Sequence, residues 1–481
     1  MTSVKQETLS GMKWSTIERF SVQGVNFLLG IIMARILTPS DYGTVGMLAI
    51  FLAVSNSFVD SGFSNALIRK LNRTEVDFST VFYFNILISL VCYSLLFASA
   101  PYISNFFNLP ILCPLLRVQS LSLIFNSLMV VHVAKLTIEL NFKALAKRAF
   151  WATIISGVIG LICAYIGMGV WSLVIQHLSY VLVNLIFVWM YLRWKPLPVF
   201  SVNSFKELFS YGSKLLVSGL LHTVYQHMTT FIIGKFFSSK ELGFYNRGTQ
   251  FATMPIDTMN AILGKVTFPI LVKLQNDDAH LISVYRKYIC ITSMIIFFGC
   301  SLLAALAKPL ILLLLTDKWA DSIIYLQIFS FAIMFDHICS INLKLLQVKG
   351  RSDLFLRLEV IKKLIAVLIL FASIPFGVIG ICVSKIIYTQ IAVFINTYYT
   401  GKLFGMGYFT QLKDFVGFFI LSVICCLPSY LLSSLYNMPN WLIIVLGLVI
   451  SCFLYYICLQ NNVYMKEIVA AVKSKIYLKR K

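Results

Sequence analysis

Apolar runs of about twenty residues recur along the chain from near residue 15 to about residue 459, separated by short polar connections. Each run matches the helix length that crosses the roughly 30 Å hydrocarbon core of a bilayer. No connection is long enough to form a soluble domain. The pattern predicts an all-α integral membrane protein of about fourteen transmembrane helices, over residues 15–37, 43–67, 78–101, 112–134, 149–168, 170–192, 212–236, 243–271, 288–307, 322–343, 358–376, 377–400, 414–436 and 440–460.

Composition supports lipid as the solvent. Of the 481 residues, 59% are hydrophobic and 12% are charged, which is more apolar surface than a water-soluble core of ordinary size buries. The formal net charge of +21 would suggest nucleic acid as the partner of a soluble protein. Here the lysines and arginines lie mainly between the apolar runs, so we expect membrane lipids and no nucleic acid as partners.

The basic residues also predict the topology. They concentrate in every second connection, and the alternate connections are nearly bare. Lysine and arginine favour the cytoplasmic side of a membrane, so both basic termini are expected in the cytoplasm and the number of helices is expected to be even. Representative basic residues of the cytoplasmic connections and termini are Lys5, Arg69, Lys143, Lys147, Arg148, Lys349 and Lys481.

A weak internal repeat divides the chain into two halves. Residues 34–43 (ARILTPSDYG) align with residues 234–243 (GKFFSSKELG), and both segments close an apolar helix, turn and begin another. Six helices separate the two copies, so the repeat is parallel, a known plan in transporters. We therefore predict an N-terminal six-helix bundle over 1–200, a second bundle over 201–400, two additional helices over 401–460 and a basic cytoplasmic tail over 461–481.

Several polar residues fall inside the predicted helices. A charged side chain near the bilayer centre costs about 2.5–3.5 kcal/mol, so it must be paired, lie near an interface or face a wet cavity. Uncharged polar residues have a second explanation, because they can hydrogen-bond neighbouring helices together. For Arg117 and Arg247, which lie near helix starts, an interfacial position is the alternative. The candidate lumen residues are Arg19, Gln23, Asn26, Asp60, Arg117, Gln226, Arg247, Asp257, Asn260, Lys265 and Lys385.

The candidate lumen is net cationic, which favours an anionic ligand. A pyrophosphate that must cross hydrocarbon offers about two negative charges that arginine can hold through its forked donors. Carboxylates in the same helices would orient the arginines or bind a coupling ion, and Asp60, Asp257 and Asp336 are the candidates. The sequence has no metal-ligand spacing, Walker A pattern or Gly-x-Ser-x-Gly pattern, so we expect no enzyme activity, no catalytic residues, no metal and no cofactor.

Three segments near the start of the chain resemble a known family. They are Trp14-Ser15 with Arg19, Gln23 and Asn26, then residues 34–43, then Asp60-Ser61-Gly62-Phe63. Their combination resembles the polysaccharide (Wzx-like) flippases of the multidrug/oligosaccharidyl-lipid/polysaccharide exporter superfamily. Residues 242–247 and Phe268-Pro269 strengthen the likeness in the second half. The resemblance implies two pseudo-symmetric six-helix bundles around a MATE-like, V-shaped cavity, plus two helices at the C-terminal end.

The resemblance also implies a function. Undecaprenyl-diphosphate-linked oligosaccharide repeat units would cross the bacterial inner membrane by alternating access, for O-antigen, capsule or exopolysaccharide biosynthesis. Arg19, Arg117, Arg247 and Lys265 would contact the pyrophosphate or sugar. A counter-flow of protons or sodium would use Asp60, Asp257 or Asp336, and a polysaccharide polymerase and glycosyltransferases would be protein partners.

Three alternatives stay open at this point. A MATE-type multidrug exporter shares the superfamily, although a cationic lumen argues against cationic drugs as cargo. A lipid II flippase shares the fold and is not excluded. A membrane glycosyltransferase or polysaccharide polymerase belongs to another class, and such enzymes usually present carboxylates or histidines on a large external loop. The longest external connection here, 308–321, has only two acidic residues, Asp317 and Asp321, and it contains no histidine.

Overall fold

The computed structural model describes residues 2–435 and 438–467, apart from the side chains of residues 2–13, 257–266, 268–269 and 435. In the part described, the regular secondary structure is entirely helical, as expected. The chain divides into two compact units, residues 1–243 and 244–481. The bundle and tail boundaries at 200, 400 and 460 stay predictions, and most of the basic tail lies outside the described residues.

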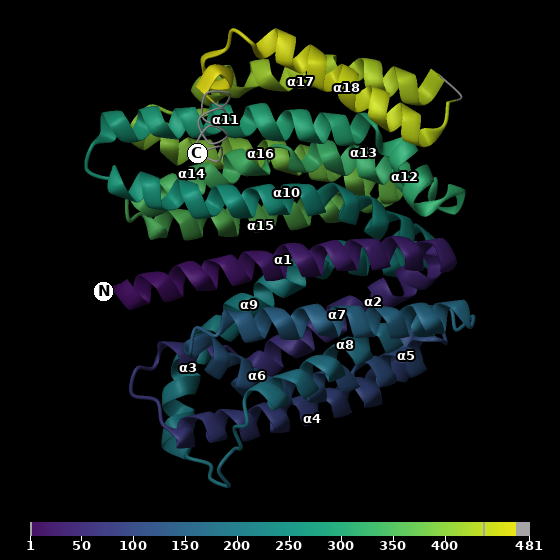
Figure 1. The fold of residues 1–481 in the computed structure, drawn as a ribbon, viewed down its shortest axis with the longest axis vertical. Helices are drawn as coiled ribbons and strands as arrows, with labels where there is room; N and C mark the ends of the chain where they lie inside the picture. The colour runs from purple at the N-terminus through teal and green to yellow at the C-terminus, as the bar shows by residue number, and fades with distance from the viewer. Residues whose placement is uncertain (1, 436–437, 468–481) are drawn as a thin grey trace. The chain divides into compact units, whose positions relative to one another are not determined.

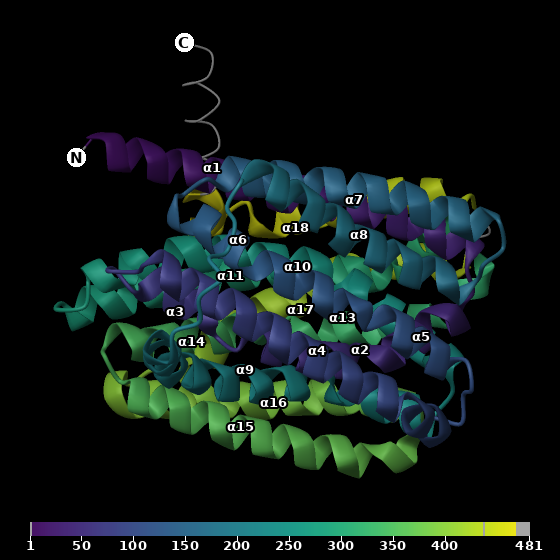
Figure 2. The same ribbon diagram turned by 90° about the horizontal axis from the view of Figure 1, so that it is seen from below.

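Unit 1 is a bundle of long helices that lie side by side (Figures 1 and 2). The α7 helix packs against α1 and α8, α6 packs against α4 and α8, and α2 packs against α9. The helices of unit 1, which ends in the first turn of α10 (Ser239–Lys273), are α1 (Thr2–Ile36), α2 (Pro39–Asp60), α3 (Phe63–Arg69), α4 (Glu75–Phe106), α5 (Leu112–Gln119), α6 (Leu121–Ile138), α7 (Phe142–Tyr165), α8 (Val170–Tyr191) and α9 (Val202–Phe236).

Unit 2 is a second helical bundle (Figure 1). The α11 helix packs against α13 and α17, α16 packs against α13, α14 and α15, and α18 covers α17. After α10, its helices are α11 (Asp278–Ala305), α12 (Ala307–Leu315), α13 (Ser322–Ile333), α14 (Asp336–Val348), α15 (Ser352–Ser373), α16 (Gly377–Phe404), α17 (Tyr408–Leu435) and α18 (Asn440–Leu459).

The helices are long and apolar enough to cross a membrane. Among the described residues, eleven stretches meet this requirement by length and composition. One of them, Ser352–Phe404, contains both α15 and α16. The α9 and α10 helices, of 35 residues each, lie outside the eleven. The expected count of about fourteen is compatible with this inventory.

Three predicted helices are broken in the structure. The predicted helix over 43–67 ends at Asp60 and resumes at Phe63, because Ser61 and Gly62 adopt left-handed backbone angles with φ of 45° and 70°. A Cβ at Gly62 would stand 2.6 Å from the carbonyl oxygen of Gly212 in α9, so glycine also allows the close approach there. The predicted helices over 112–134 and 322–343 are likewise divided, into α5 with α6 and α13 with α14.

The repeated segments confirm that the two halves share local structure. At the start of α2, Thr38 and Asp41 form a capping box, in which the Asp41 amide donates to Thr38 Oγ1 (3.3 Å) and the Thr38 amide donates to Asp41 Oδ2 (2.8 Å). Two hundred residues later, the Glu241 amide donates to Ser238 Oγ (3.1 Å) and the Ser238 amide donates to Glu241 Oε2 (3.2 Å). The same cap therefore begins both α2 and α10.

The two copies of this segment also contact each other, within unit 1. The Ser40 and Ser239 hydroxyls are hydrogen-bonded at 2.8 Å. A Cβ added at Gly43 would overlap the carbonyl oxygen of Ser239, and a Cβ added at Gly243 would overlap that of Pro39. The contact is reciprocal, because Gly43 meets Ser239 and Gly243 meets Pro39, and these residues hold equivalent positions in the two copies. We call it the α2/α10 crossing.

The α2/α10 crossing should not tolerate a methyl group. Gly43→Ala places a Cβ against backbone that cannot rotate away, so we expect a loss of about 1–3 kcal/mol or more in the free energy of unfolding. The readout is the thermal unfolding midpoint of the purified protein in detergent. Gly219→Ala in α9 is the matched control, since nothing lies within 4 Å of its added Cβ and helical alanine is favoured over glycine by about 0.5–1 kcal/mol. Equal midpoints for the two variants would contradict this account.

Candidate functional site

The polar stripe predicted on the first helix is present on α1. Arg19 and Asn26 are exposed, and Gln23 is half-buried. Their spacing of three and four residues places them along one side of the helix. Since a polar stripe on a membrane helix needs partners or water, these three residues remain candidates for a lumen.

Polar residues of α2 tie this helix to its neighbours. Asn126 Nδ2 in α6 donates to Asn56 Oδ1 at 3.0 Å, and the Ser57 hydroxyl bonds the Thr223 hydroxyl of α9 at 3.2 Å. Such contacts are the packing role that uncharged polar residues can play in membranes. Gln226, one turn beyond Thr223, is instead exposed.

Asp60 and Arg117 both have local partners. Asp60, at the end of α2, interacts with the side chain and the backbone of Ser64 at the start of α3. The Arg117 guanidinium donates from Nε to the carbonyl oxygen of Phe97 (3.3 Å) and lies 4.3 Å from the centre of the Phe97 ring. The roles of Asp60 in ion coupling and of Arg117 in substrate binding stay predictions.

Arg247 is buried near the start of α10. It is 6% exposed, its Nη1 donates to Gln250 Oε1 at 2.7 Å, and its guanidinium lies 5.8 Å from the Trp319 ring. The role of Arg247 in a lumen and its interfacial alternative both stay predictions. Three further candidates in α10 have side chains outside the described residues, namely Asp257, Asn260 and Lys265.

Unit 2 brings charged side chains from three helices together. The thiol of Cys339 lies within electrostatic range of Asp336 (α14), Lys362 (α15) and Lys385 (α16). Lys362 is 6% exposed and forms an ion pair with Glu359 one turn earlier. The Lys385 ammonium lies 4.9 Å from the Tyr388 ring. We call Asp336, Glu359, Lys362 and Lys385 the unit 2 charge cluster.

Two members of this cluster, Asp336 and Lys385, were candidates from the sequence, whereas Glu359 and Lys362 were missed. The signal for the missed pair was available, because opposite charges three residues apart inside an apolar run predict a helix-face ion pair. Arg148 was missed for another reason. It was expected in a cytoplasmic connection, but α7 begins at Phe142, so Arg148 lies within the helix.

Charged residues near the helix ends are mostly paired. The Lys70 ammonium donates to Asp77 (3.1 Å) and to Glu207 (2.9 Å), and Lys135 forms an ion pair with Glu75 at 2.7 Å. Burial alone would lower the pKa of Lys70, but the hydrogen bonds and charges of these two carboxylates outweigh it and raise that pKa. These pairs link α4 to α6 and to α9.

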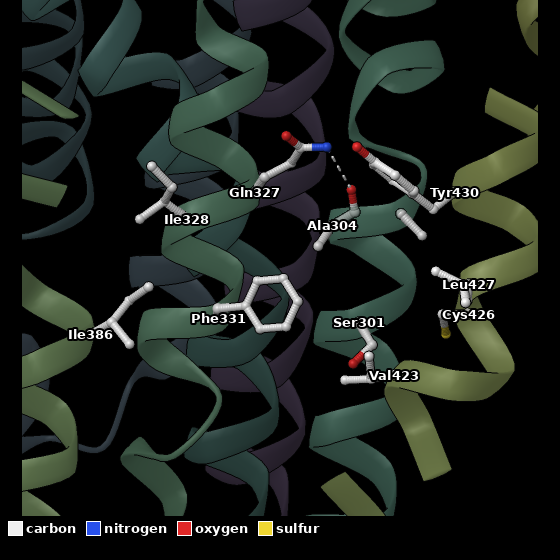
Figure 3. A pocket seen from close by; sticks show the side chains of 11 residues that line it. Ser301, Ala304, Gln327, Ile328, Phe331, Ile386, Val423, Cys426, Leu427 and Tyr430 are labelled. Carbon is white, nitrogen blue, oxygen red and sulfur yellow. Dashed lines mark hydrogen bonds between the residues drawn. The ribbon is translucent and has the colours of Figure 1, made fainter. Parts of the chain in front are cut away.

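A cavity of about 370 Å³ lies in unit 2 among α11, α13, α16 and α17 (Figure 3). Its lining is apolar except for a few groups. The Gln327 amide donates to the carbonyl oxygen of Ala304 at 3.3 Å, and the Ser301 hydroxyl is buried without a hydrogen-bond partner. Because no charged side chain belongs to this lining, the cavity suits an apolar group and would not compensate a diphosphate. Its lining residues are Ser301, Ala304, Ala305, Gln327, Ile328, Phe331, Ile386, Val423, Cys426, Leu427 and Tyr430.

Comparison with known proteins shows the family to which the chain belongs. A family model described as polysaccharide biosynthesis protein matches residues 32–324, more than half of the chain. The teichuronic acid biosynthesis protein TuaB of Bacillus subtilis (strain 168) is 26% identical over 383 residues, which are 78% of each chain. The lipopolysaccharide biosynthesis protein WzxC of Escherichia coli (strain K12) is 23% identical over 440 residues, which are 89% of this chain and 86% of that protein.

The fold also has a solved counterpart. The lipid II flippase MurJ, in an inward closed conformation, superimposes with a TM-score of 0.72 and covers 94% of this chain and 99% of that one. The two sequences are 14% identical, so the likeness concerns the fold.

The Lys362–Glu359 pair, in which the lysine is buried and the carboxylate side chain is 30% exposed, generates a stability prediction. Lys362→Met leaves the Glu359 carboxylate without its cation, and we expect a loss of about 1–3 kcal/mol in the free energy of unfolding, less than for a fully buried pair. Adding Glu359→Gln should recover most of this loss, because neither charge then remains. Arg351→Gln, which breaks a pair with side chains 45% and 62% exposed, should leave the unfolding midpoint nearly unchanged. Unfolding of the purified variants in detergent distinguishes these values, and a double variant as unstable as Lys362→Met would refute the pairing.

Proposed function

The chain belongs to the polysaccharide biosynthesis protein family, and from this membership we propose that it is a flippase for lipid-linked oligosaccharides. It is a multi-pass integral membrane protein, and membrane lipids surround it. The cargo proposed is an undecaprenyl-diphosphate-linked oligosaccharide repeat unit, used for cell-surface polysaccharide biosynthesis. Translocation would proceed by alternating access, with both termini in the cytoplasm and the protein in the bacterial inner membrane.

The observation that supports transport most strongly is the presence of charged side chains on the membrane helices of each unit. The unit 2 charge cluster contains two lysines and two carboxylates on helices that are otherwise apolar. Charges in a membrane segment are costly, and they characteristically mark the route of an ion or a polar substrate. A diphosphate head group needs cations along its route, because hydrocarbon offers no compensation for its charge.

The proposed contacts are given for each unit by itself. In unit 1, Arg19 would contact the head group, with Gln23 and Asn26 on the same side of α1. In unit 2, Lys385 is the proposed contact. Asp336 would serve a coupling ion, proton or sodium, and Asp60 and Asp257 are the other candidates. Gln226, Asn260, Lys265, Arg117 and Arg247 remain proposed lumen residues.

A lipid II flippase is the second candidate, because MurJ shares the fold over nearly the whole chain. Both cargoes have a polyprenyl diphosphate, so the same cationic groups would serve them. The family match favours the oligosaccharide, since the matching model and the relatives TuaB and WzxC are all described by polysaccharide biosynthesis.

Reconstitution tests the proposal directly. Liposomes containing the purified protein and a fluorescent undecaprenyl-diphosphate-linked oligosaccharide should show protein-dependent movement of the label between leaflets, read by an impermeant quencher. Lipid II in the same assay separates the two candidates. The absence of movement for both substrates, across several oligosaccharides and across proton and sodium gradients, would overturn the proposal.

Two charge removals should impair transport without impairing insertion. Arg19→Ala and Lys385→Ala each remove a cation proposed to hold the diphosphate, so we expect the initial rate to fall about tenfold or more, the equivalent of losing one charge-assisted hydrogen bond. Arg351→Ala, in the connection between α14 and α15, is the control and should stay within about twofold of the parent protein. Rates unchanged in both test variants would remove these residues from the pathway.

A further inference from the structure

The seam between α1 and α7 in unit 1 is closed at two levels. Trp14 of α1 lies under the Lys143 ammonium of α7, 5.6 Å from ring centre to nitrogen. About three helical turns beyond Glu18, Leu29 fills the notch left by Gly157, where an added Cβ would overlap the leucine side chain. The pairs advance together along both helices, so α1 and α7 run parallel and in contact.

Between these levels, Arg148 lacks the partners that a buried guanidinium needs. Its Nε and Nη1 are buried and have no hydrogen-bond partner. The side chain as a whole is half-buried, so part of it stays accessible. By contrast, Lys70, Lys135 and Arg286 all reach carboxylates in the same structure. Arg148 is therefore an exception among the cations of this protein that are partly buried near helix ends.

The surroundings of Arg148 contain one carboxylate. Glu18 on α1 acts on Arg148 electrostatically, and so does Tyr180 on α8. Glu18 nevertheless stops short of the two unpartnered nitrogens.

The chemistry of guanidinium restricts what could complete this site. Arginine has five N–H donors and no acceptor, and its fork fits an anion with two oxygens, a carboxylate or a phosphate. Hydrocarbon and water-poor protein leave such donors uncompensated, so retention of the group in a membrane helix indicates a functional role. The nearby carboxylate does not reach, which leaves a phosphate as the anion that fits.

The depth of Arg148 agrees with a phosphate attached to a lipid. Arg148 is six residues beyond Phe142, the start of α7, which is roughly 9 Å along the helix. The polar head-group region adds several ångströms to each side of the roughly 30 Å hydrocarbon core. With the start of α7 at the membrane surface, as the sequence predicts, the guanidinium would lie near the level at which a lipid diphosphate joins its hydrocarbon chain.

We propose that Arg148 binds a phosphate group of the lipid-linked substrate, and that Glu18 competes with this phosphate for the guanidinium. The identity of the lipid rests on the proposed function, whereas the anion site rests on the unpartnered nitrogens alone. Substrate binding satisfies the donors of Arg148. After release, Glu18 approaches the guanidinium and replaces the phosphate, which limits rebinding.

Binding of a soluble probe tests the site without transport. The full-length protein in nanodiscs of zwitterionic lipid is titrated with farnesyl diphosphate and, separately, with inorganic pyrophosphate, by isothermal titration calorimetry. Arg148→Gln should weaken farnesyl diphosphate binding about tenfold or more, the effect of losing charge-assisted hydrogen bonds. Glu18→Gln should strengthen it about threefold, because the competing carboxylate is gone. Lys147→Gln, at the exposed neighbouring position of α7, is the control and should change it less than about twofold.

Several outcomes would overturn the inference. One is unchanged affinity in Arg148→Gln, another is an equal loss in Lys147→Gln, and a third is weaker binding in Glu18→Gln. A dependence on Arg148 that appears with inorganic pyrophosphate but not with farnesyl diphosphate would refute a lipid-linked ligand. The thermal midpoint of Arg148→Gln should equal or exceed that of the parent protein, because an uncompensated charge is removed. A lower midpoint with normal affinity would assign Arg148 a structural role.

The two proposals can fail separately. If the parent protein moves no lipid-linked oligosaccharide in liposomes but farnesyl diphosphate binding depends on Arg148, the flippase proposal fails and the anion site stands. If the parent protein transports and Arg148→Gln binds and transports at normal levels, only the anion site is refuted. Glu18→Gln provides a second variant whose expected effect is a gain, so poor folding of Arg148→Gln does not remove the test.

Discussion

Hydrocarbon offers no hydrogen-bond partner, and this single property of the bilayer determines most of what the structure does. Backbone amides and carbonyls must satisfy one another, so the described chain is helical and its long helices pack side by side. The same property makes each charged side chain in a helix expensive. Most of these charged side chains form ion pairs, such as Lys362 with Glu359 and Lys135 with Glu75. At Arg148 two guanidinium nitrogens lack a hydrogen-bond partner, and this is the reason for proposing a ligand there.

Polar residues in the membrane helices fall into two groups. Asn56, Asn126, Ser57 and Thr223 pair with one another across helix contacts, so their role is adhesion within unit 1. Asp60 interacts with Ser64 of α3 across the break at Ser61. The second group comprises the charged side chains that gather around Cys339 and the exposed residues of α1. Together with Arg148, this second group offers the charged and exposed polar side chains that an anionic cargo needs.

Fold class and helix positions could be predicted from the sequence, because a run of about twenty apolar residues has one stable form in a bilayer. The repeat at residues 34–43 and 234–243 was also visible, and both copies form the same cap. Helix ends were less predictable. The α7 helix extends seven residues before its apolar run, since the interface tolerates polar residues, and Arg148 was therefore expected in a connection. The break at Ser61 depends on a close approach of α9 that local sequence does not reveal.

The α2/α10 crossing makes the residues allowed in one repeated segment depend on the other. Gly43 lies on the backbone beside Ser239, and Gly243 lies on the backbone beside Pro39. Two identical copies meeting across a symmetry axis make contacts of this reciprocal kind, and here a duplicated segment makes them within one chain. A side chain that enlarges one copy collides with the other, so the two copies cannot diverge independently at these positions. The side chains allowed at Gly43 and Gly243 are therefore limited by the backbone of the other segment.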